Sequence, residues 1–325
     1  MWHNIKHSFL LFALLFGFFT IHVAAAQQAV WIDTDPACGH ANTDDVDDCW
    51  ALLLALRSNE LEIRGISTLF GNGSGEKSYD TAKELIQRFT RKNEMPSIHR
   101  GADSAIDLRE PKSNGASHAL AIALAKEPLT LIALGPLSNI ATLILNNPEQ
   151  AVNIRQIIAI AGQRSEPELG FYPGSSRLLH LHDLNFRKDV VAFDVILHSS
   201  IPITLVPYEV AEKISIQPSD LALLHKGEHQ AKWLANISQP WLNFWQTSLQ
   251  SDGFYPFDSL AVGLLIMPDL FTCEKIPAKI QHNRALFVSS RDYLLISHNF
   301  SEQRLVSYCH NIKQTFKHKL IERLR

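Results

Sequence analysis

Short apolar runs alternate with longer stretches of helical periodicity along the first two thirds of the chain. The runs 29–34, 62–68, 129–134, 154–161 and 203–206 are short and apolar, which predicts strands. Between them, residues 47–58, 75–91, 136–146 and 189–198 repeat apolar positions with helical spacing, which predicts helices. In the first of these helices, Cys49, Leu52, Leu53 and Leu56 fall on one face. Strands that alternate with helices predict an α/β fold, an open and mostly parallel sheet flanked by helices with a Rossmann-like core.

The second half of the chain is more helical. Residues 227–250 and 259–266 predict helices, 285–288 and 304–308 a late β pair, and 311–325 a basic terminal helix. We see no linker and no internal repeat, so one domain is expected over residues 27–325. Open parallel sheets place their sites at the carboxyl ends of the strands. The loops that this rule selects follow Ile32, Ser67, Leu134, Ala161 and Val206.

The first 26 residues have a different pattern from the rest of the chain. Lys6 precedes the apolar run FLLFALLFGFF at 9–19, and three alanines end at Ala26. This pattern predicts a secretory signal peptide over residues 1–26. The alternative is a permanent membrane anchor, because the apolar stretch approaches the roughly 20 residues that a span needs. The small-residue ending favours cleavage, hence a secreted or periplasmic protein without stable membrane insertion afterwards.

Composition and charge narrow the classes of partner. The net charge of −3 provides no basic field for nucleic acid, and a 46% hydrophobic composition is that of a globular protein. The four cysteines are Cys38, Cys49, Cys273 and Cys309. An exported chain can oxidise them, and they allow three pairings. Four buried free thiols are the alternative, and no C-x-x-C pair indicates zinc.

The segment 31–54 carries six aspartates around a predicted strand-to-helix junction: Asp33, Asp35, Asp44, Asp45, Asp47 and Asp48. One or two of them are expected to cap the helix and complement its dipole. Six are more than capping needs. Hard cations such as calcium prefer sites made only of oxygen ligands, and without a cation so many carboxylates would repel one another. The segment therefore favours a metal site.

Further segments extend this observation along the chain. They are DTDP at 33–36 with DD at 47–48, STLFGN at 67–72, RGAD at 100–103, LTLIALGPLSNIA at 129–141, DLNF at 183–186 and FDSLAV at 257–262. In this order they resemble the motifs of the nucleoside hydrolase family (inosine–uridine preferring hydrolases and relatives). The resemblance spans residues 29 to about 266.

The resemblance implies a Ca²⁺ cofactor, a small-molecule nucleoside as substrate and a role for each matching position. Calcium would be bound by Asp35, Asp48, the backbone carbonyl of Leu134, and Asp258. Asp35 would also be catalytic, by accepting a proton from the water that calcium holds. The substrate would be bound by Asp47 and Asn185 at the ribose hydroxyls, with Asn72 helping, by Asp183 near the ribose 5′ end, and by Phe257 at the base. A homo-oligomer is compatible with the sequence.

General chemistry agrees with these implied roles. Cleavage of an N-ribosidic bond passes through an oxocarbenium-like sugar, as glycoside cleavage does. A cation lowers the pKa of a water, and a carboxylate within hydrogen-bond distance completes its activation. Negative carboxylates around the sugar favour its developing positive charge.

Three departures from the family pattern stand out. Residues 37–46 are longer than the family's spacing; they either bulge out as a loop, which a Cys38–Cys49 disulfide could pin, or change the register so that Asp44 or Asp45 takes a ligand role. Phe257 stands where the family has a proton-donating His, so leaving-group activation must come from elsewhere. Aromatic stacking on the base is the alternative, with Phe257, Tyr255, Phe254, Trp241 and Trp245 as candidates. Arg177 falls nearest to the family's Asn before the DLNF segment.

Other polar and aromatic side chains have two interpretations each. Near Asn185, the side chains of His180, His182, Arg164 and Arg187 either recognise the base or the 5′ group, or form a solvated loop. The pair Trp241 and Trp245 is one helical turn apart and is more typical of a core than of a site.

Three hypotheses for function follow. The first is an active, calcium-dependent ribonucleoside hydrolase that releases free base and ribose. The second is a nucleoside- or ribose-binding protein of the same fold with weak or no catalysis, and the third is an unrelated exported protein with a stabilising calcium site. The matches at Asp35, Asp48, Asn185 and Asp258 favour the first.

Overall fold

The structure is a computed structural model of the whole chain. It describes residues 27–39, 41, 43–91, 94–164, 183–283, 291–301 and 304–325. The predicted signal peptide over 1–26 lies outside these residues, as do His180, His182 and Arg177. Among the described helices, none is long and apolar enough to cross a membrane.

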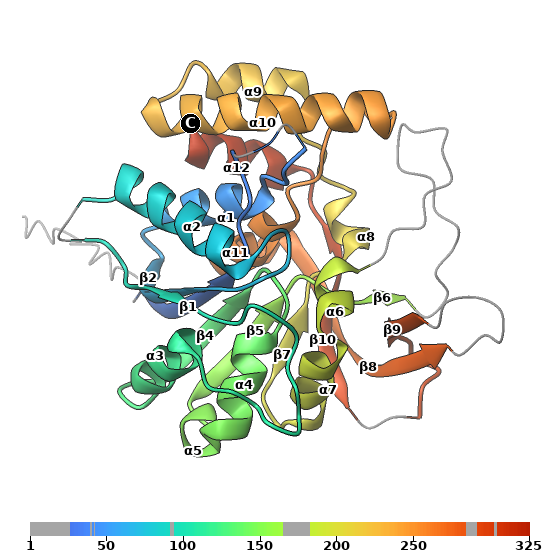
Figure 1. Ribbon diagram of the computed structural model, residues 1–325. Helices are drawn as coiled ribbons and strands as arrows, with labels where there is room; N and C mark the ends of the chain where they lie inside the picture. Colours follow the sequence, from blue (N-terminus) through green and yellow to red (C-terminus); the bar gives the residue numbers. More distant parts are fainter. Residues whose placement is uncertain are drawn as a thin grey trace, which may run out of the picture.

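The described strands form one sheet in the order β3-β2-β1-β4-β5-β7-β10-β8-β9-β6 (Figure 1). Their bounds are β1 Gln28–Thr34, β2 Leu61–Thr68, β3 Ile98–Arg100, β4 Leu129–Ala133, β5 Ile154–Ala159, β6 Gln163–Arg164, β7 Ile203–Leu205, β8 Phe271–Asn283, β9 Arg291–Ile296 and β10 Leu305–Ile312. From β3 to β10 every neighbouring pair is parallel, whereas β8 pairs antiparallel with both β10 and β9. The predicted open and mostly parallel sheet is confirmed.

Helices cover both faces of this sheet (Figure 1). Their bounds are α1 Asp47–Leu56, α2 Gly75–Phe89, α3 Gly115–Leu124, α4 Ser138–Asn146, α5 Pro148–Ala151, α6 Leu184–Lys188, α7 Val190–His198, α8 Tyr208–Ala211, α9 Pro218–Leu224, α10 His229–Ser248, α11 Phe257–Ile266, the 3₁₀ helix η1 Pro268–Leu270, and α12 Thr315–Leu324. One face carries α1, α2 and α9 to α12, and the other carries α3, α4, α5 and α7.

The alternation of side chains along β1 creates two cores. Val30 and Ile32 point into the core shared with α1, α10 and α11, whereas Ala29 and Trp31 point into the core shared with α3, α4 and α7. Successive side chains of a strand point to opposite faces, so a central strand that is buried on both sides must be apolar throughout. Burial on both sides fixes the register of β1 and thereby the position of the polar residues that follow Ile32.

Helix α1 is buried all round. Burial extends beyond the face expected to carry Cys49, Leu52, Leu53 and Leu56, because every residue from 47 to 55 is buried. A helix that is surrounded by protein lies in the middle of a layer, and α1 packs between β1 and the helices α10, α11 and α12. Its two N-terminal aspartates are therefore buried as well.

The C-terminal part differs most from the sequence-based expectation. The partner of β10 is β8, which covers residues 271–283 and was not expected, whereas residues 285–288 lie outside the described part of the chain. The helix expected over 311–325 begins only at Thr315, because residues 311 and 312 continue β10. Cys273 and Cys309 face each other across β8 and β10 and form a disulfide.

The other two cysteines also pair with each other. Cys38 and Cys49 form the second disulfide, so no cysteine in the chain is free. This pairing pins the segment between β1 and α1. Of the three pairings that the sequence allowed, the structure contains Cys38 with Cys49 and Cys273 with Cys309.

Candidate functional site

Three buried carboxylates converge between two helix N-termini. Asp47 and Asp48 lie in the first turn of α1, and Asp258 lies in the first turn of α11. One oxygen from each of the three lies within 4.8 Å of the other two. Neither helix has a side-chain cap, so their N-terminal dipoles also point positive charge toward this group. The packing of α1 against α11 brings together residues more than 200 positions apart in the sequence.

Asp35 approaches the same cluster from the end of β1. Its backbone N–H donates to Asp48 Oδ1 at 3.1 Å, and its Oδ2 accepts from the backbone N–H of Asn72 at 2.6 Å. Its Oδ1 is buried and has no hydrogen-bond partner among the described residues. A buried, unsatisfied carboxylate oxygen is costly, so this atom is expected to bind a ligand.

Two glycines make room for the Asp35 carboxylate. A Cβ atom on Gly71 would lie 1.8 Å from Asp35 Oδ2, and a Cβ on Gly135 would lie 2.4 Å from Oδ1. Both glycines are in segments that the sequence singled out, but their role becomes visible only in the packed structure. They are needed because the backbones of the loops after β2 and β4 approach the carboxylate closely.

Asp48 is held by three side-chain or backbone donors. Thr34 Oγ1 and the backbone N–H of Asp35 donate to its Oδ1, and Asn72 Nδ2 donates to Oδ2 at 3.1 Å. Asn72 thus positions both Asp35 and Asp48, one through its backbone and one through its side chain.

The charges of the cluster require compensation. Burial, followed by the charge of Asp48, holds the pKa of Asp35 well above its usual range, and burial with the charge of Asp47 does the same for Asp258. Burial also raises the pKa of Asp48 to about 7. Among the described residues, no Lys or Arg forms an ion pair with these carboxylates; the nearby Lys77 pairs with Asp44 instead.

This donor set fits a hard divalent cation. It consists of buried carboxylate oxygens, one of which lacks any partner, and its mutual repulsion would be relieved by positive charge. Asp47, which the family resemblance assigns to the ribose, lies in the converging group together with Asp48 and Asp258. The residues that would hold the cation are therefore Asp35, Asp48 and Asp258, with Asp47 directly beside them.

Asn185 lies at the ends of the neighbouring strands. Its Nδ2 donates to the carbonyl of Leu134 at 2.7 Å and to the carbonyl of Ile160 at 3.0 Å. Leu134 O, the expected backbone ligand, thus follows β4 at the same edge of the sheet as Asp35 and accepts a hydrogen bond there. The two bonds fix the amide of Asn185, which is half-buried, at this edge.

Asp183 has both carboxylate oxygens bound to backbone N–H groups. Oδ1 accepts from Phe186 at 3.0 Å, which caps α6, and Oδ2 accepts from Gly162 at 2.6 Å. Burial raises its pKa to about 6. In the structure this side chain therefore connects the loop after β5 to the start of α6 and positions Asn185, two residues along the chain.

Asn139 is a positioning residue to which sequence reasoning assigned no role. Its Nδ2 donates to Asp33 Oδ1 at 2.8 Å, and its Oδ1 accepts from Ala102 N at 2.9 Å. It thereby connects β1 to the loop after β3. Asn139 lies in the segment 129–141, which resembles a family motif. Only the folded structure shows that its amide reaches Asp33.

The described residues of the insert at 37–46 form a loop between β1 and α1. Asp44 accepts from Ala41 N and forms an ion pair with Lys77 at 2.9 Å, so it is not placed among the converging carboxylates. Asp45 Oδ1 accepts from the backbone N–H of Asp47 at 3.2 Å. Of the two aspartates considered for a changed register, only Asp45 lies beside the cluster.

Phe257, which precedes Asp258, belongs to a group of aromatic rings that contact one another. Phe257 contacts Tyr208 and Tyr255 with ring centroids 6.0 and 5.9 Å apart. Trp245 packs on Tyr255 at 4.9 Å and on Trp241 at 6.0 Å. Among the five rings considered for base stacking, Phe254, Tyr255 and Trp245 are buried in the core, whereas Phe257 and Trp241 keep exposed surface.

The basic residues near Asn185 are only partly described. Arg164 forms an ion pair with Glu274 at 3.0 Å and lies over the ring of Tyr308, and Arg187 is exposed. His180 and His182 lie outside the described residues.

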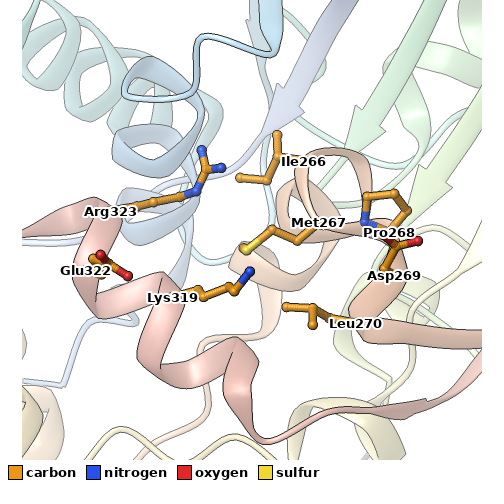
Figure 2. A pocket seen from close by; sticks show the side chains of 8 residues that line it. All are labelled: Ile266, Met267, Pro268, Asp269, Leu270, Lys319, Glu322 and Arg323. Atoms are coloured by element: carbon orange, nitrogen blue, oxygen red, sulfur yellow. The ribbon is translucent and has the colours of Figure 1, made fainter. Parts of the chain in front are cut away.

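A hollow of about 550 Å³ opens elsewhere on the surface, between η1 and α12 (Figure 2). Side chains from Ile266 to Leu270 line one side of it, and Lys319, Glu322 and Arg323 line the other. Arg323 is bound to Glu60, and none of the acidic cluster reaches this hollow. It is separate from the candidate site.

The chain matches a known protein family over most of its length. Residues 30–310 match the model of the family described as inosine-uridine preferring nucleoside hydrolase. A non-specific ribonucleoside hydrolase RihC from Klebsiella pneumoniae (strain 342) is 28% identical over 265 residues, which cover 75% of this chain and 80% of that protein. Another RihC, from Salmonella agona (strain SL483), is 27% identical over 271 residues, covering 77% and 82%.

Solved structures are similar over nearly the whole length. A plant nucleoside hydrolase, the PpNRh1 enzyme, has a TM-score of 0.76 at 20% identity, covering 92% of this chain and 99% of that chain. A purine-preferring ribonucleoside hydrolase from Gardnerella vaginalis has a TM-score of 0.74 at 18% identity, covering 91% and 98%. These similarities show the fold.

Proposed function

Because the chain belongs to the inosine-uridine preferring nucleoside hydrolase family, whose members are N-ribosyl hydrolases, we propose that it hydrolyses the N-glycosidic bond of ribonucleosides with Ca²⁺ as its cofactor. The products are free base and ribose. The observation that carries the proposal is the unpartnered, buried Oδ1 of Asp35 beside the converging carboxylates. The ribonucleoside hydrolases among the relatives support the substrate class.

Asp35 is the proposed general base. Calcium bound by the cluster would supply positive charge that lowers the pKa of a water and orients the ribose hydroxyls. The Asn72 N–H fixes one oxygen of Asp35, which leaves Oδ1 to accept the proton of the attacking water. Fixed geometry of this kind accounts for a large part of catalysis, because the base needs no reorientation.

The remaining residues bind and stabilise the ribose. We assign Asp47 and Asn185 to the ribose hydroxyls, with Asn72 holding the site together. Buried carboxylates next to the sugar stabilise its positive charge in the oxocarbenium-like transition state. Asp183 acts on the 5′ side; its bonds to Gly162 and Phe186 set the position of the loop that carries Asn185.

A second candidate function is nucleoside or ribose binding with weak or no catalysis. The observation in its favour is Phe257, a hydrocarbon ring that cannot protonate a leaving base. Under the first function, the nucleobase stacks on Phe257 or Trp241, the two of the five candidate rings that keep exposed surface.

Release of free base decides between the two candidates. Inosine, adenosine, guanosine, uridine and cytidine are each incubated with the protein and calcium, and the base is quantified by chromatography. We expect multiple turnovers with at least one of them. Saturable binding without any base release would support the binding function instead.

We also propose that the mature protein is secreted or periplasmic. Two disulfides are typical of oxidising compartments. The N-terminal sequence of the protein recovered outside the cytoplasm should begin at Gln27, whereas a chain that keeps residues 1–26 in the membrane fraction would support the anchor.

Gly71→Ala is expected to lower kcat by about 100-fold while the protein stays folded. A Cβ at this position would lie 1.8 Å from Asp35 Oδ2, so the carboxylate must move, and displacements near 1 Å cost about this factor. The measurement is steady-state base release together with circular dichroism. Gly73→Ala is the matched control, because its Cβ would meet only the flexible Lys77 side chain, at 3.1 Å. Equal rates for both variants would contradict the claim that Gly71 makes room for the Asp35 carboxylate.

Phe257→Ala is expected to raise KM by about 3- to 10-fold and to change kcat less. An aromatic contact contributes about 0.5–1.5 kcal/mol beyond area burial, and this contact is made in ground and transition states alike. KM and kcat are measured for the best nucleoside. Phe300→Ala serves as control, since Phe300 packs under Lys279 on another part of the molecule. An unchanged KM would remove Phe257 from base binding, and Trp241→Ala then tests the second ring.

A further inference from the structure

The Cys38–Cys49 disulfide joins the two segments that carry the acidic cluster. Cys38 follows Asp35 by three residues, and Cys49 directly follows Asp48. The two cysteines are 11 positions apart in sequence, with Cα atoms 6.5 Å apart, and both are buried. The covalent bond therefore lies next to the carboxylates and closes the base of the loop between them.

The described residues of this loop are attached through Asp44 and Asp45. Asp44 holds it through the Ala41 N–H and the ion pair with Lys77, whose side chain is 30% exposed. Ion pairs at a surface contribute about 0–1 kcal/mol. Gly39 has a positive φ of 91° and passes Ile237 of α10. Hydrogen bonds from Thr34 and from the Asp35 N–H also hold the Asp35 segment against the start of α1, but both end on the Asp48 carboxylate, which is itself a proposed ligand, whereas the disulfide involves no ligand.

The two segments also repel each other. Asp35 on one side and Asp47 and Asp48 on the other are acidic and buried in one place. As long as no cation is bound, ionisation of these groups favours separation of the segments. A covalent bond between the segments opposes this separation. Because the loop is already closed, less conformational entropy is lost when the cation binds.

We propose that Cys38 and Cys49 are positioning residues: their disulfide keeps Asp35 and Asp48 at the spacing that a divalent cation requires before the cation binds. The inference rests on the proposed calcium dependence and goes beyond it, because it makes calcium affinity depend on the redox state of one disulfide. A dithiol reductant transfers two electrons and two protons to the S–S bond, yields two thiols and becomes a cyclic disulfide. The Asp35 segment is then joined to the start of α1 by noncovalent contacts alone.

The test compares the two disulfides of the same protein. The double variant Cys38→Ser with Cys49→Ser and the double variant Cys273→Ser with Cys309→Ser are titrated with CaCl₂ by calorimetry. The second pair is the matched control, because β10 lies four strands from β1 in the sheet. We expect the calcium Kd to rise at least tenfold, about 1.4 kcal/mol, in the first variant and to stay within twofold of the wild type in the second.

A second readout separates positioning from general destabilisation. Base release is measured as a function of calcium concentration. In the Cys38/Cys49 variant the half-saturating concentration should rise with the Kd, whereas saturating calcium should restore kcat to within about threefold. Circular dichroism at each calcium concentration shows that the variant is folded, so that a higher half-saturating concentration reflects weaker binding and not loss of stability.

Reduction of the folded wild-type protein by dithiothreitol gives the same comparison without relying on the serine variants. Mass spectrometry after alkylation identifies which disulfide has opened, and circular dichroism shows that the fold persists. A calcium Kd that is the same with and without the Cys38–Cys49 bond, or that rises equally when either disulfide is removed, would overturn the inference. Absence of base release by the wild type would count against the proposed function and not against this one, because the calcium Kd is measured without substrate.

Discussion

Asp35→Asn is expected to lower kcat for ribonucleoside hydrolysis by about 10³-fold or more. The substitution keeps the shape of the side chain and its bond from the Asn72 N–H, but an amide cannot accept the proton of the attacking water. General-base catalysis contributes about 10²–10⁴-fold, and loss of one negative ligand weakens the metal site in addition. The measurement is kcat and KM with inosine and uridine at saturating calcium.

The control for this variant is Asp107→Asn. Asp107 is an exposed carboxylate paired with Arg109 at 2.7 Å, outside the acidic cluster, and its replacement should leave kcat within about twofold. The thermal unfolding temperature of both variants should remain close to that of the wild type, or rise for Asp35→Asn, because a buried repulsive charge has been removed. Turnover by Asp35→Asn at the wild-type rate would discard Asp35 as the base.

Removal of calcium is expected to abolish turnover and to destabilise the protein. A ligand at 100 times its Kd stabilises the folded state by about 2.7 kcal/mol, and the buried carboxylates lose this compensation when a chelator takes the ion. EGTA should therefore lower both base release and the unfolding temperature, and added CaCl₂ should restore both. Asp258→Asn should raise the calcium Kd by about 100-fold, because Asp258 is the only member of the converging group outside the first helix. Undiminished activity in excess chelator would contradict the calcium dependence.

Much of the fold can be predicted from the sequence because the central strands are buried on both sides. Apolar residues are in the majority in the runs that become β1, β4 and β5, so pattern alone identifies them. Strand β8 contains Glu274, Lys275 and Pro277 and has no comparable pattern. It forms because β10 and β9 offer hydrogen bonds on both of its edges, which is a property of the tertiary structure.

The site residues that lie in sequence motifs could be predicted from the sequence. Asp35, Asp48 and Asp258 could be selected from the sequence, and the structure places them together at the carboxyl edge of β1 and at two helix N-termini. The cradle formed by Gly71 and Gly135 could not, since it depends on how closely two loops approach one side chain. The place of Asp44 beside Lys77, rather than among the ligands, depends on the path of the insert, which no local pattern encodes.

The pairing of the cysteines is a further feature that the sequence alone does not determine. Four cysteines allow three pairings, and only spatial proximity selects Cys38 with Cys49 and Cys273 with Cys309. The first pair lies at the junction of β1 and α1, where the insert could have run along several paths. Its position beside the carboxylates is the reason that a structural bond can influence metal affinity.

An anomalous difference map from crystals grown with calcium tests most directly whether one cation is shared by residues far apart in the sequence. We predict a single strong peak with carboxylate oxygens of Asp35, Asp48 and Asp258 at about 2.3–2.6 Å, the usual calcium–oxygen distance. A map without a peak between these three side chains, from crystals of a protein that hydrolyses nucleosides, would contradict this prediction.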